Sequence, residues 1–283
     1  MQATTLFDVQ AIPAADTCCL GPATRTLCAD FIWRPVGDLV PGDELIAFDG
    51  FAKAGHRRHM RIATVLTAPR CRRLAYRVSF TDGREVITSS EHQWLTDPSS
   101  CWIYTRNIAA GRPVRDLGVP WEVEDSWEAG WLGGVFDGEA SLSPCTVKSK
   151  GSGWQITFAQ NEGAVLDLAE HLCKKRGYES RKKIEPHRDV RRLVITGIYD
   201  CLRFLGECRP VRLMGRSRPW IESRTPTRSR GTARSRQYNA TVREVEFLGE
   251  RDLIAIETTT QTLLTEGLLS SLVRTPMKPS RHP

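Results

Sequence analysis

Two carboxylates, Asp137 and Glu139, close a short segment in which three glycines interrupt a helical pattern; residues 131–142 read WLGGVFDGEASL. Glycine in a helix interior costs about 0.5–1 kcal/mol relative to alanine, so Gly133 and Gly134 require a reason. Close approach of a second helix is one reason, and an ordinary tightly packed helix is the alternative. Acids at the C-terminal end of a helix meet the negative end of its dipole, so this pair predicts a compensating cation or a capping role. Hard carboxylate oxygens also suit Mg²⁺, which can stabilise a phosphate and activate a water in phosphodiester cleavage.

The same segment resembles a known family. Residues 132–140, LGGVFDGEA, are similar to the LAGLIDADG motif of homing endonucleases. The strand-like ITFAQNE and the helix-like VLDLAEHL that follow extend the resemblance over residues 126–225. In that family the motif helix packs against a twin helix, and an acid at its end binds a divalent metal beside the scissile phosphates. A glutamine and a basic residue, usually lysine, lie near the metal-bound water.

The resemblance implies roles for individual residues of this chain. Glu139 would be the metal ligand and catalytic carboxylate, with Mg²⁺ as the cofactor. Gln160 would match the glutamine, and Arg212 or Arg216 would stand in for the basic residue. The pairing interface between the two motif helices would contain Leu132, Gly133, Gly134 and Asp137.

One such motif is visible, so the resemblance implies a homodimer that cuts double-stranded DNA at a near-palindromic site. Strands predicted near 141–149, 154–160, 179–187 and 190–197 would form the DNA-binding surface. Its candidate DNA-binding residues are Lys148, Lys150, Arg181, Lys182, Lys183, Arg188, Arg191 and Arg192. Alternate residues of a strand point to opposite faces, so the register decides which of them can reach DNA. A solvated sheet face is the alternative interpretation.

The flanking halves carry a second resemblance. CLGPATRT from Cys19, REVITSSEHQWLT around His92 and VREVEFLGERDLIAIETTTQTLLTEGLLSS are similar, in that order, to the sequence blocks of inteins and Hint domains. This implies that Cys19 is the nucleophile of an acyl shift that His92 assists. Where the family ends in His-Asn, this sequence has Ser270-Ser271, and no Asn follows Asn239. Without a carboxamide there is no cyclisation, so we expect a free-standing, splicing-defective intein descendant with a relic Cys19 and a buried, hydrogen-bonded His92.

Three functional hypotheses follow. The first is a site-specific, metal-dependent homing endonuclease of a mobile genetic element, with a Hint-like domain that no longer splices. The second is a protein-splicing element, including a precursor trapped by mutation; a thioester at Cys19 that a thiol such as DTT releases would favour it. The third is a DNA-binding protein without catalysis, against which the acid at position 139 argues.

The segments that must position these residues show two different sequence patterns. Short apolar runs separated by Gly, Pro and Asp predict an all-β region over 19–118, and the same pattern returns over 241–272. Between them, residues 126–225 alternate helical and strand-like segments in the order αββαββα. The predicted fold class is α+β, an all-β, horseshoe-like Hint domain split by an inserted LAGLIDADG endonuclease domain. The remaining expected segments are a leader (1–18), an Arg-rich linker (226–240) and a tail (273–283).

Composition bears on partners and location. The formal net charge of +7 is a weak pointer to a polyanionic partner, and nine arginines within 209–236 predict a flexible basic segment. No apolar run is long enough to span a membrane, and the N-terminus lacks the basic and apolar regions of a secretion signal. The nine cysteines are irregularly spaced and include no CxxC pair, which argues against a disulfide framework or a zinc site. We therefore expect a cytoplasmic protein that acts on DNA and has no membrane partner.

Overall fold

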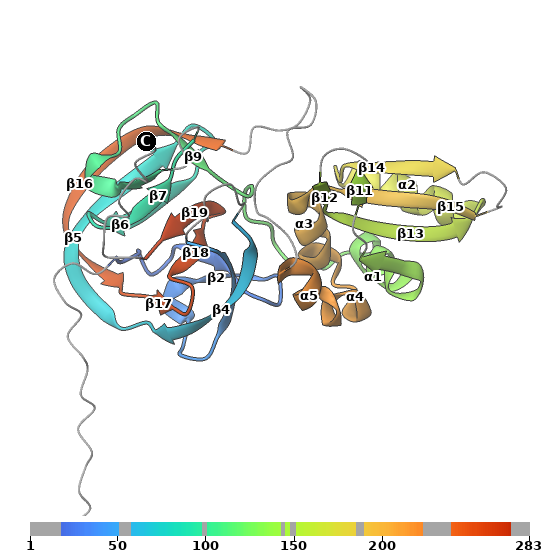
Figure 1. Cartoon of the computed structure of the whole chain (residues 1–283), viewed down its shortest axis with the longest axis horizontal. Coiled ribbons are helices and arrows are strands. Elements are labelled where there is room, and N and C mark those ends of the chain that lie inside the picture. Colours follow the sequence, from blue (N-terminus) through green and yellow to red (C-terminus); the bar gives the residue numbers. More distant parts are fainter. Residues whose placement is uncertain are drawn as a thin grey trace, which may run out of the picture.

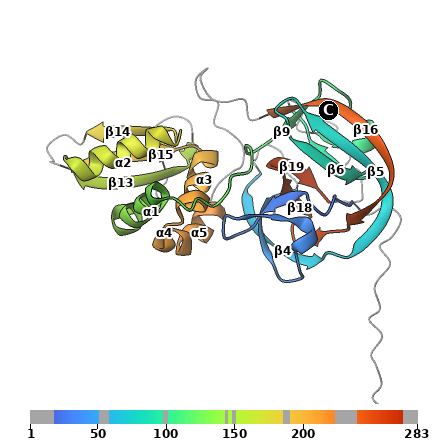
Figure 2. The same cartoon turned by 180° about the vertical axis from the view of Figure 1, so that it is seen from behind.

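The chain folds into two units, one built of β-strands and the other of helices packed on a sheet (Figures 1 and 2). The computed structural model describes residues 18–50, 58–97, 101–142, 145–147, 151–184, 190–222 and 239–272. The β unit combines residues from both ends of the sequence, and the α+β unit lies between them in the chain. This is the arrangement of one domain inserted into another.

The β unit contains thirteen of the nineteen strands of the described residues and two short 3-10 helices, Val36–Asp38 and Thr105–Asn107. The strands are β1 (Arg25–Leu27), β2 (Trp33–Pro35), β3 (Glu44–Phe48), β4 (Met60–Thr67), β5 (Arg70–Phe80), β6 (Glu85–Ser89), β7 (Gln93–Leu95), β8 (Trp102–Tyr104), β9 (Pro113–Arg115), β16 (Asn239–Ile254), β17 (Glu257–Thr258), β18 (Thr262–Thr265) and β19 (Leu268–Ser271).

Strands from the two ends of the sequence alternate within the sheets of the β unit. The sheet orders are β2-β1-β18-β19-β7-β8, β6-β5-β16-β9 and β17-β4-β3. The long strands β5 and β16 pair from Phe80↔Val242 to Arg70↔Ile254 and form the outer arc of the unit (Figure 1). Because β16, β18 and β19 lie between N-terminal strands, neither half can complete its sheets alone.

The α+β unit carries four strands of one sheet, a separate hairpin and five helices. The helices are α1 (Trp127–Glu139), α2 (Ala164–Lys175), α3 (Ile198–Cys208), α4 (Val211–Gly215) and α5 (Ser217–Glu222). The strands are β10 (Ala140–Leu142), β11 (Cys145–Val147), β12 (Gly151–Gly153), β13 (Gln155–Asn161), β14 (Ser180–Ile184) and β15 (Val190–Thr196). The main sheet has the order β10-β13-β15-β14, and β11 pairs only with β12.

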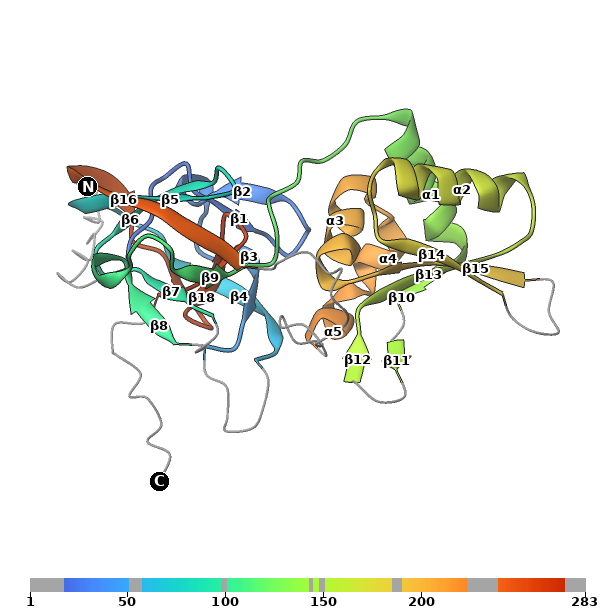
Figure 3. The ribbon, with the colours of Figure 1, turned by 90° about the horizontal axis from the view of Figure 1, so that it is seen from above.

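Helices α1 and α2 lie on one face of this sheet, and the β11–β12 hairpin projects from the other side (Figure 3). Phe158 and Leu193 are directly opposite each other on β13 and β15, and both are fully buried under the helices. The Phe136 ring of α1 stacks on Phe158 with centroids 4.9 Å apart. Aromatic and aliphatic side chains on this one face therefore hold α1 against the middle of the sheet.

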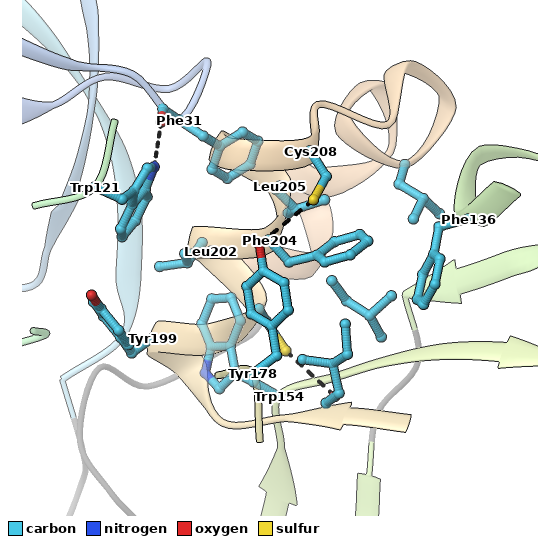
Figure 4. Close-up of a cluster of buried hydrophobic side chains, with 14 of the residues drawn as sticks. Phe31, Trp121, Phe136, Trp154, Tyr178, Tyr199, Leu202, Phe204, Leu205 and Cys208 are labelled. Atoms are coloured by element: carbon cyan, nitrogen blue, oxygen red, sulfur yellow. Dashed lines mark hydrogen bonds between the residues drawn. The ribbon is translucent and has the colours of Figure 1, made fainter. Parts of the chain in front are cut away.

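The two units share a continuous apolar core around α3 (Figure 4). The Trp121 indole N–H donates to the Phe31 carbonyl oxygen at 3.0 Å. A Cβ at Gly206 of α3 would lie 2.0 Å from Trp121 Nε1 and 2.7 Å from the Phe31 oxygen. Glycine is thus required where the helix meets the β unit, and the contact fixes the two units against each other.

The structure corrects the expected elements in two places. The strand expected over 141–149 ends as β10 at Leu142, and the β11–β12 hairpin that follows was not predicted. Its Gly- and Ser-rich second strand has the composition of a loop and depends on backbone pairing to β11. The segment 209–236 was expected to be flexible, yet its first part forms α4 and α5, because Leu213, Trp220 and Ile221 are buried in the shared core.

Three predicted segments lie wholly or mostly outside the described residues, namely 1–17 of the leader, 226–238 of the linker and the tail 273–283. Cys18, expected at the end of the leader, belongs to the β unit. It is buried, and its thiol donates to the Glu91 carbonyl oxygen at 3.0 Å. Within the described ranges, none of the helices has the length and apolar character needed to cross a bilayer.

Candidate functional site

Helix α1 has two opposite faces with different neighbours. Ser126 caps its start, where the hydroxyl oxygen accepts a hydrogen bond from the Ala129 N–H at 3.3 Å. The buried face consists of Ala129, Leu132, Gly133 and Phe136. The opposite face, here called the glycine face, consists of Trp127, Gly130, Trp131, Gly134 and Gly138. The 3.6-residue period of the helix places these five residues in one stripe.

The two adjacent glycines of α1 have different roles. A Cβ at Gly133 would lie 2.1 Å from the carbonyl oxygen of Cys208, so Gly133 allows the end of α3 to approach within its own chain. A Cβ at Gly134 would meet no atom of the described residues within 4 Å. The expectation that Leu132 and Gly133 form a pairing interface is therefore wrong, because both are buried in the chain's own core. Gly134 remains a candidate for that interface.

The glycine face is exposed and apolar. Cβ atoms built at Gly130 and Gly138, as at Gly134, would have no neighbour within 4 Å among the described residues. Trp127 is 67% exposed and stacks on Trp131 with ring centroids 6.3 Å apart. Trp131 is half-buried and packs against the core, so the exposed part of this face is Trp127 and the three glycines. A second helix could approach closely at the glycines.

Asp137 and Arg212 join the end of α1 to the start of α4. The Asp137 carboxylate accepts hydrogen bonds from the backbone N–H groups of Arg212 at 2.6 Å and Leu213 at 3.2 Å. In return the Arg212 guanidinium donates to the carbonyl oxygens of Asp137, Gly138 at 3.2 Å and Ala140 at 2.8 Å. The acid caps a helix N-terminus and the cation satisfies a helix C-terminus. The sequence predicted a capping role or a compensating cation at this helix end, and the structure has both: Asp137 caps α4, and Arg212 is the cation at the end of α1. The sequence did not predict that these two residues interact.

These contacts change two of the predicted roles. Asp137 was expected at the pairing interface, and its carboxylate instead holds α4. Arg212 was expected beside a metal-bound water, yet its guanidinium is occupied by main-chain carbonyls. Arg212 is therefore a positioning residue for the end of α1 in this structure. Arg216, the other candidate, is exposed and follows α4 as its C-terminal cap.

Glu139 is exposed at the last position of α1, directly before β10. No hydrogen bond or ion pair to its carboxylate occurs among the described residues, unlike Asp137. Ala140 pairs with Phe158, which places Glu139 beside the stretch of β13 that ends in Gln160. Gln160 lies on the same face of β13 as Phe158, toward the helices, and its side-chain oxygen accepts from the Asn161 N–H at 2.9 Å. The two candidates thus lie at the same end of the sheet.

The residues at this end match Mg²⁺ chemistry only in part. A free carboxylate at Glu139 is the hard oxygen ligand that Mg²⁺ prefers. Within the described part of the chain there is no cluster of three or more His, Cys, Asp or Glu side chains that could hold a metal ion. One chain therefore contributes at most one free carboxylate at this place, and a complete site would need a second copy, a phosphate and water.

The strand register divides the basic residues between the two faces of the sheet. Lys182 pairs with the buried Leu193 and forms ion pairs with Asp167 at 3.1 Å and Glu170 at 2.9 Å on α2, so it faces the helices. Arg191 lies on that face as well, opposite Gln160, and its guanidinium is 3.3 Å from Glu162. Lys182 and Arg191 were both DNA-binding candidates with the register left open, and alternation along the strands points both toward the helices.

The remaining described candidates share the opposite face, here called the outer face. It carries Arg181, Lys183 and Arg192. Lys183 and Arg192 are directly opposite each other on β14 and β15, and like charges in that position repel. A bound anion would remove this repulsion. The other candidates, Lys148, Lys150 and Arg188, lie outside the described residues.

In the β unit, the predicted relic residues are brought together by the sheets. Cys19 is fully buried, and its N–H donates to Ser89 Oγ at 3.0 Å. His92 follows Ser89 on the same turn and is also fully buried. Strand β19 places Ser271 opposite Gln93, next to His92. The first and last blocks of the two sequence halves therefore meet at one place, which the sequence order alone did not show.

The chemistry at this place differs from the expectation for His92. Both ring nitrogens lack a hydrogen-bond partner among the described residues, and the ring packs edge-on against Trp94 with centroids 4.8 Å apart. Burial lowers the pKa of His92 to about 3, so the side chain is neutral at ordinary pH. Burial, then the hydrogen bond to Cys71, raises the pKa of the Cys19 thiol. A neutral thiol is a weak nucleophile.

Sequence reasoning missed Ser89 and Cys71, which are hydrogen-bond partners of Cys19. Ser89 stands three residues before His92, a spacing that could have suggested a shared turn. Cys71 is 52 residues away from Cys19, and no local pattern links the two. Their proximity follows from the bridges of Leu20 to Ile254 and Thr88, which place Cys19 beside β5, β6 and β16.

Among known proteins, similarity to this chain was found in solved structures. No family model matches the sequence, and no curated protein matches it. Among solved structures, the gp41-1 intein is similar, with 11% identity and a TM-score of 0.37 over 90% of this chain and 98% of that chain. A DnaB intein from Synechocystis has 7% identity and a TM-score of 0.41 over 90% of this chain and 99% of that chain. The Msm DnaB1 intein splicing domain has 25% identity and a TM-score of 0.26 over 34% of this chain and 67% of that chain. Since each TM-score is below 0.5, a relationship to inteins stays a proposal.

Proposed function

We propose that this protein is a site-specific, metal-dependent DNA endonuclease of the LAGLIDADG type. Two copies would act on a near-palindromic site in the cytoplasm, each contributing one carboxylate to the cut. The β unit would be a Hint-like domain that no longer splices and serves as a rigid support. The observation that carries the proposal is the Glu139 carboxylate, which has no partner among the described residues, at the end of a helix whose exposed face carries Gly130, Gly134 and Gly138.

Three features support the parts of this proposal. The glycine face offers a second copy a close approach, which would bring two Glu139 side chains near one symmetry axis. The outer face of the sheet gathers Arg181, Lys183 and Arg192, as a surface for phosphates requires. When bound, a divalent ion would stabilise phosphate charge and supply an activated water. Glu139 would hold it, while Arg212 and Asp137 keep the end of α1 in place.

The decisive experiment is cleavage of a DNA library in the presence of Mg²⁺, followed by sequencing of the cut ends. A single site with two inverted half-sites, cut on both strands, is the expected result. Sequence-specific binding without any cut would favour the non-catalytic DNA-binding alternative. No specific binding at all would contradict both proposals.

Two neighbouring arginines test whether the outer face binds DNA. Arg192→Gln removes a positive charge from the outer face, so we expect DNA binding about three- to tenfold weaker and a salt dependence lower by about one counterion. Arg191→Gln removes the same charge from the helix-covered face, where Glu162 already pairs with it. We expect that variant to bind DNA like the wild type. Fluorescence anisotropy over a salt series measures both quantities.

The comparison between positions 191 and 192 is informative because the two changes leave the same net charge. Equal losses would mean that only overall charge matters. A larger loss at Arg191 than at Arg192 would place DNA on the other face and contradict the proposal.

A second candidate function, protein splicing, is favoured by one arrangement. Cys19, Ser89 and His92 lie together, and β19 ends beside them. Two observations weigh against it. Ser271 offers no carboxamide to cyclise, and burial keeps the Cys19 thiol protonated.

We therefore expect the purified chain to remain at full length. Overnight incubation with DTT should release no fragment that begins at Cys19, and no product should join residues 1–18 to 272–283. Intact mass spectrometry checks both outcomes. A DTT-dependent fragment would show that the acyl shift persists, and a joined product would establish splicing.

A further inference from the structure

Cys19 and Cys71 bring two thiols into contact at a place that the proposed endonuclease does not use. Their sulfur atoms are 3.3 Å apart. Cys19 is fully buried, whereas Cys71 on β5 is partly exposed. The surrounding side chains include Ala75, Leu253 and Ala255, which are apolar. One thiol of the pair is therefore accessible to solvent and the other is not.

The backbone on both sides of the pair is held in place. The Cys19 N–H donates to Ser89 Oγ, and the Cys19 carbonyl oxygen accepts from the Ser89 N–H, both at 3.0 Å. The Thr88 hydroxyl donates to the same carbonyl at 3.2 Å. Cys71 lies in the β5 ladder, opposite Leu253 of β16. A disulfide needs sulfur atoms about 2.05 Å apart, so the side chains must approach by about 1.2 Å while the backbone stays where it is.

The environment gives the two thiols different reactivity. Burial and the neighbouring Cys71 raise the pKa of Cys19, so its thiolate is disfavoured. Cys71 is partly exposed, so an oxidant in solution can reach its thiol, whereas Cys19 is fully buried. Cys71 is thus the thiol that reacts first, and Cys19 is positioned to react second.

We propose that Cys19 and Cys71 form a redox pair that closes to a disulfide when the protein meets a disulfide oxidant such as glutathione disulfide. The Cys71 thiolate attacks one sulfur of the oxidant, which forms a mixed disulfide and releases one glutathione thiolate. Cys19, held 3.3 Å from Cys71, then attacks Cys71 Sγ; the second glutathione leaves and takes up the Cys19 proton, so that it departs as a thiol. Two thiols and one glutathione disulfide become one protein disulfide and two glutathiones.

The bond would have two consequences. It would tie the first segment of the β unit to the outer arc formed by β5 and β16, across 52 residues of sequence. It would also remove the Cys19 thiol from any acyl chemistry, reversibly, because a reductant restores both thiols. The pair is thus a thiol switch within the β unit, independent of the endonuclease site.

Peptide mapping of the full chain tests the proposal. The protein is incubated with glutathione disulfide, blocked with iodoacetamide, unfolded and digested. We expect a peptide that links Cys19 to Cys71, a loss of 2 Da in the intact mass measured before the iodoacetamide step, and reversal by DTT. A stable glutathione adduct on Cys71 without the link would overturn the proposal, and so would a folded wild type that stays fully reduced.

Two variants give the matched comparison. Cys71→Ser removes one partner and should abolish the 2 Da loss, whereas Cys18→Ser changes the neighbouring cysteine and should leave the link intact. In thermal melting, the oxidised wild type should unfold about 5–10 °C above the reduced form, and Cys71→Ser should show no such difference. If the link instead joins Cys18 to Cys71, the assignment to Cys19 is wrong. The wild-type peptide map decides the matter even where a variant folds poorly.

Discussion

Replacing Glu139 with glutamine is expected to abolish double-strand cutting while DNA binding stays within about tenfold of the wild type, about 1.4 kcal/mol. Glutamine keeps the size of the side chain and removes the charge that would hold a divalent ion. Loss of that interaction should lower the cutting rate by at least about 1000-fold, on the order of 4 kcal/mol. Because Glu139 is exposed and has no partner among the described residues, the fold should not change. Cleavage of the selected site with a titration of Mg²⁺ measures the effect.

Glu128→Gln is the control for this experiment. It makes the same chemical change in the first turn of the same helix, where Glu128 pairs with Lys175 at 2.5 Å. We expect it to cut like the wild type. If Glu139→Gln also cuts at the wild-type rate, the assignment of the catalytic carboxylate is wrong. If both variants lose activity together with binding, the helix rather than the carboxylate is responsible.

The second large effect is expected at the two adjacent glycines of α1. Gly134→Leu places a side chain on the exposed glycine face, where a twin helix would have to come close. Such overpacking costs about 1–3 kcal/mol, which weakens pairing by about 5- to 150-fold. We expect the variant to fold, to be a monomer on DNA, and to lose concerted cutting of the two strands. Light scattering of the DNA complex measures the stoichiometry.

Gly133→Ala provides the contrast, because its Cβ would lie 2.1 Å from the Cys208 oxygen. This variant should lose about 3 kcal/mol or more of folding stability, since α1 and α3 must separate. Gly134→Ala should fold at least as well as the wild type, because alanine favours a helix over glycine by about 0.5–1 kcal/mol. If wild-type protein cuts both strands as one chain per duplex, the pairing proposal is refuted.

The sequence by itself predicted the features of this protein that depend only on residues close together along the chain. The 3.6-residue period predicted helices within residues 126–225 in the order αββαββα, and the structure has α1, α2 and α3 there. Two acids at the end of a helix predicted a cation or a cap, because the electrostatics of a helix end are local. The interruption of one β region by an α+β region could also be predicted from the sequence, because the spacing of apolar residues changes along the chain. The residue type at position 271 can also be read from the sequence, and a serine there offers no carboxamide to cyclise.

Tertiary structure alone decided which side of each element faces the core. Gly133 and Gly134 are indistinguishable by type, and only the position of Cys208 makes one of them an internal contact and the other an exposed surface. Arg191 and Arg192 differ likewise, since the pairing of Arg191 with Gln160 and of Arg192 with Ala159 sends them to opposite faces. A one-residue shift in register would exchange them, and nothing local sets that register.

Long-range contacts were equally beyond the sequence. Arg212 reaches the end of α1 across 75 residues, and Cys71 reaches Cys19 across 52. Such pairs form because sheets and a shared core bring distant segments together. The free energy that brings these pairs together comes from burial and packing of other residues in the sheets and the core. The residue types of the pair alone therefore do not predict the contact. Residue types and local order could therefore be predicted from this sequence, whereas the partners of its charged and reactive side chains depended on how the two units pack.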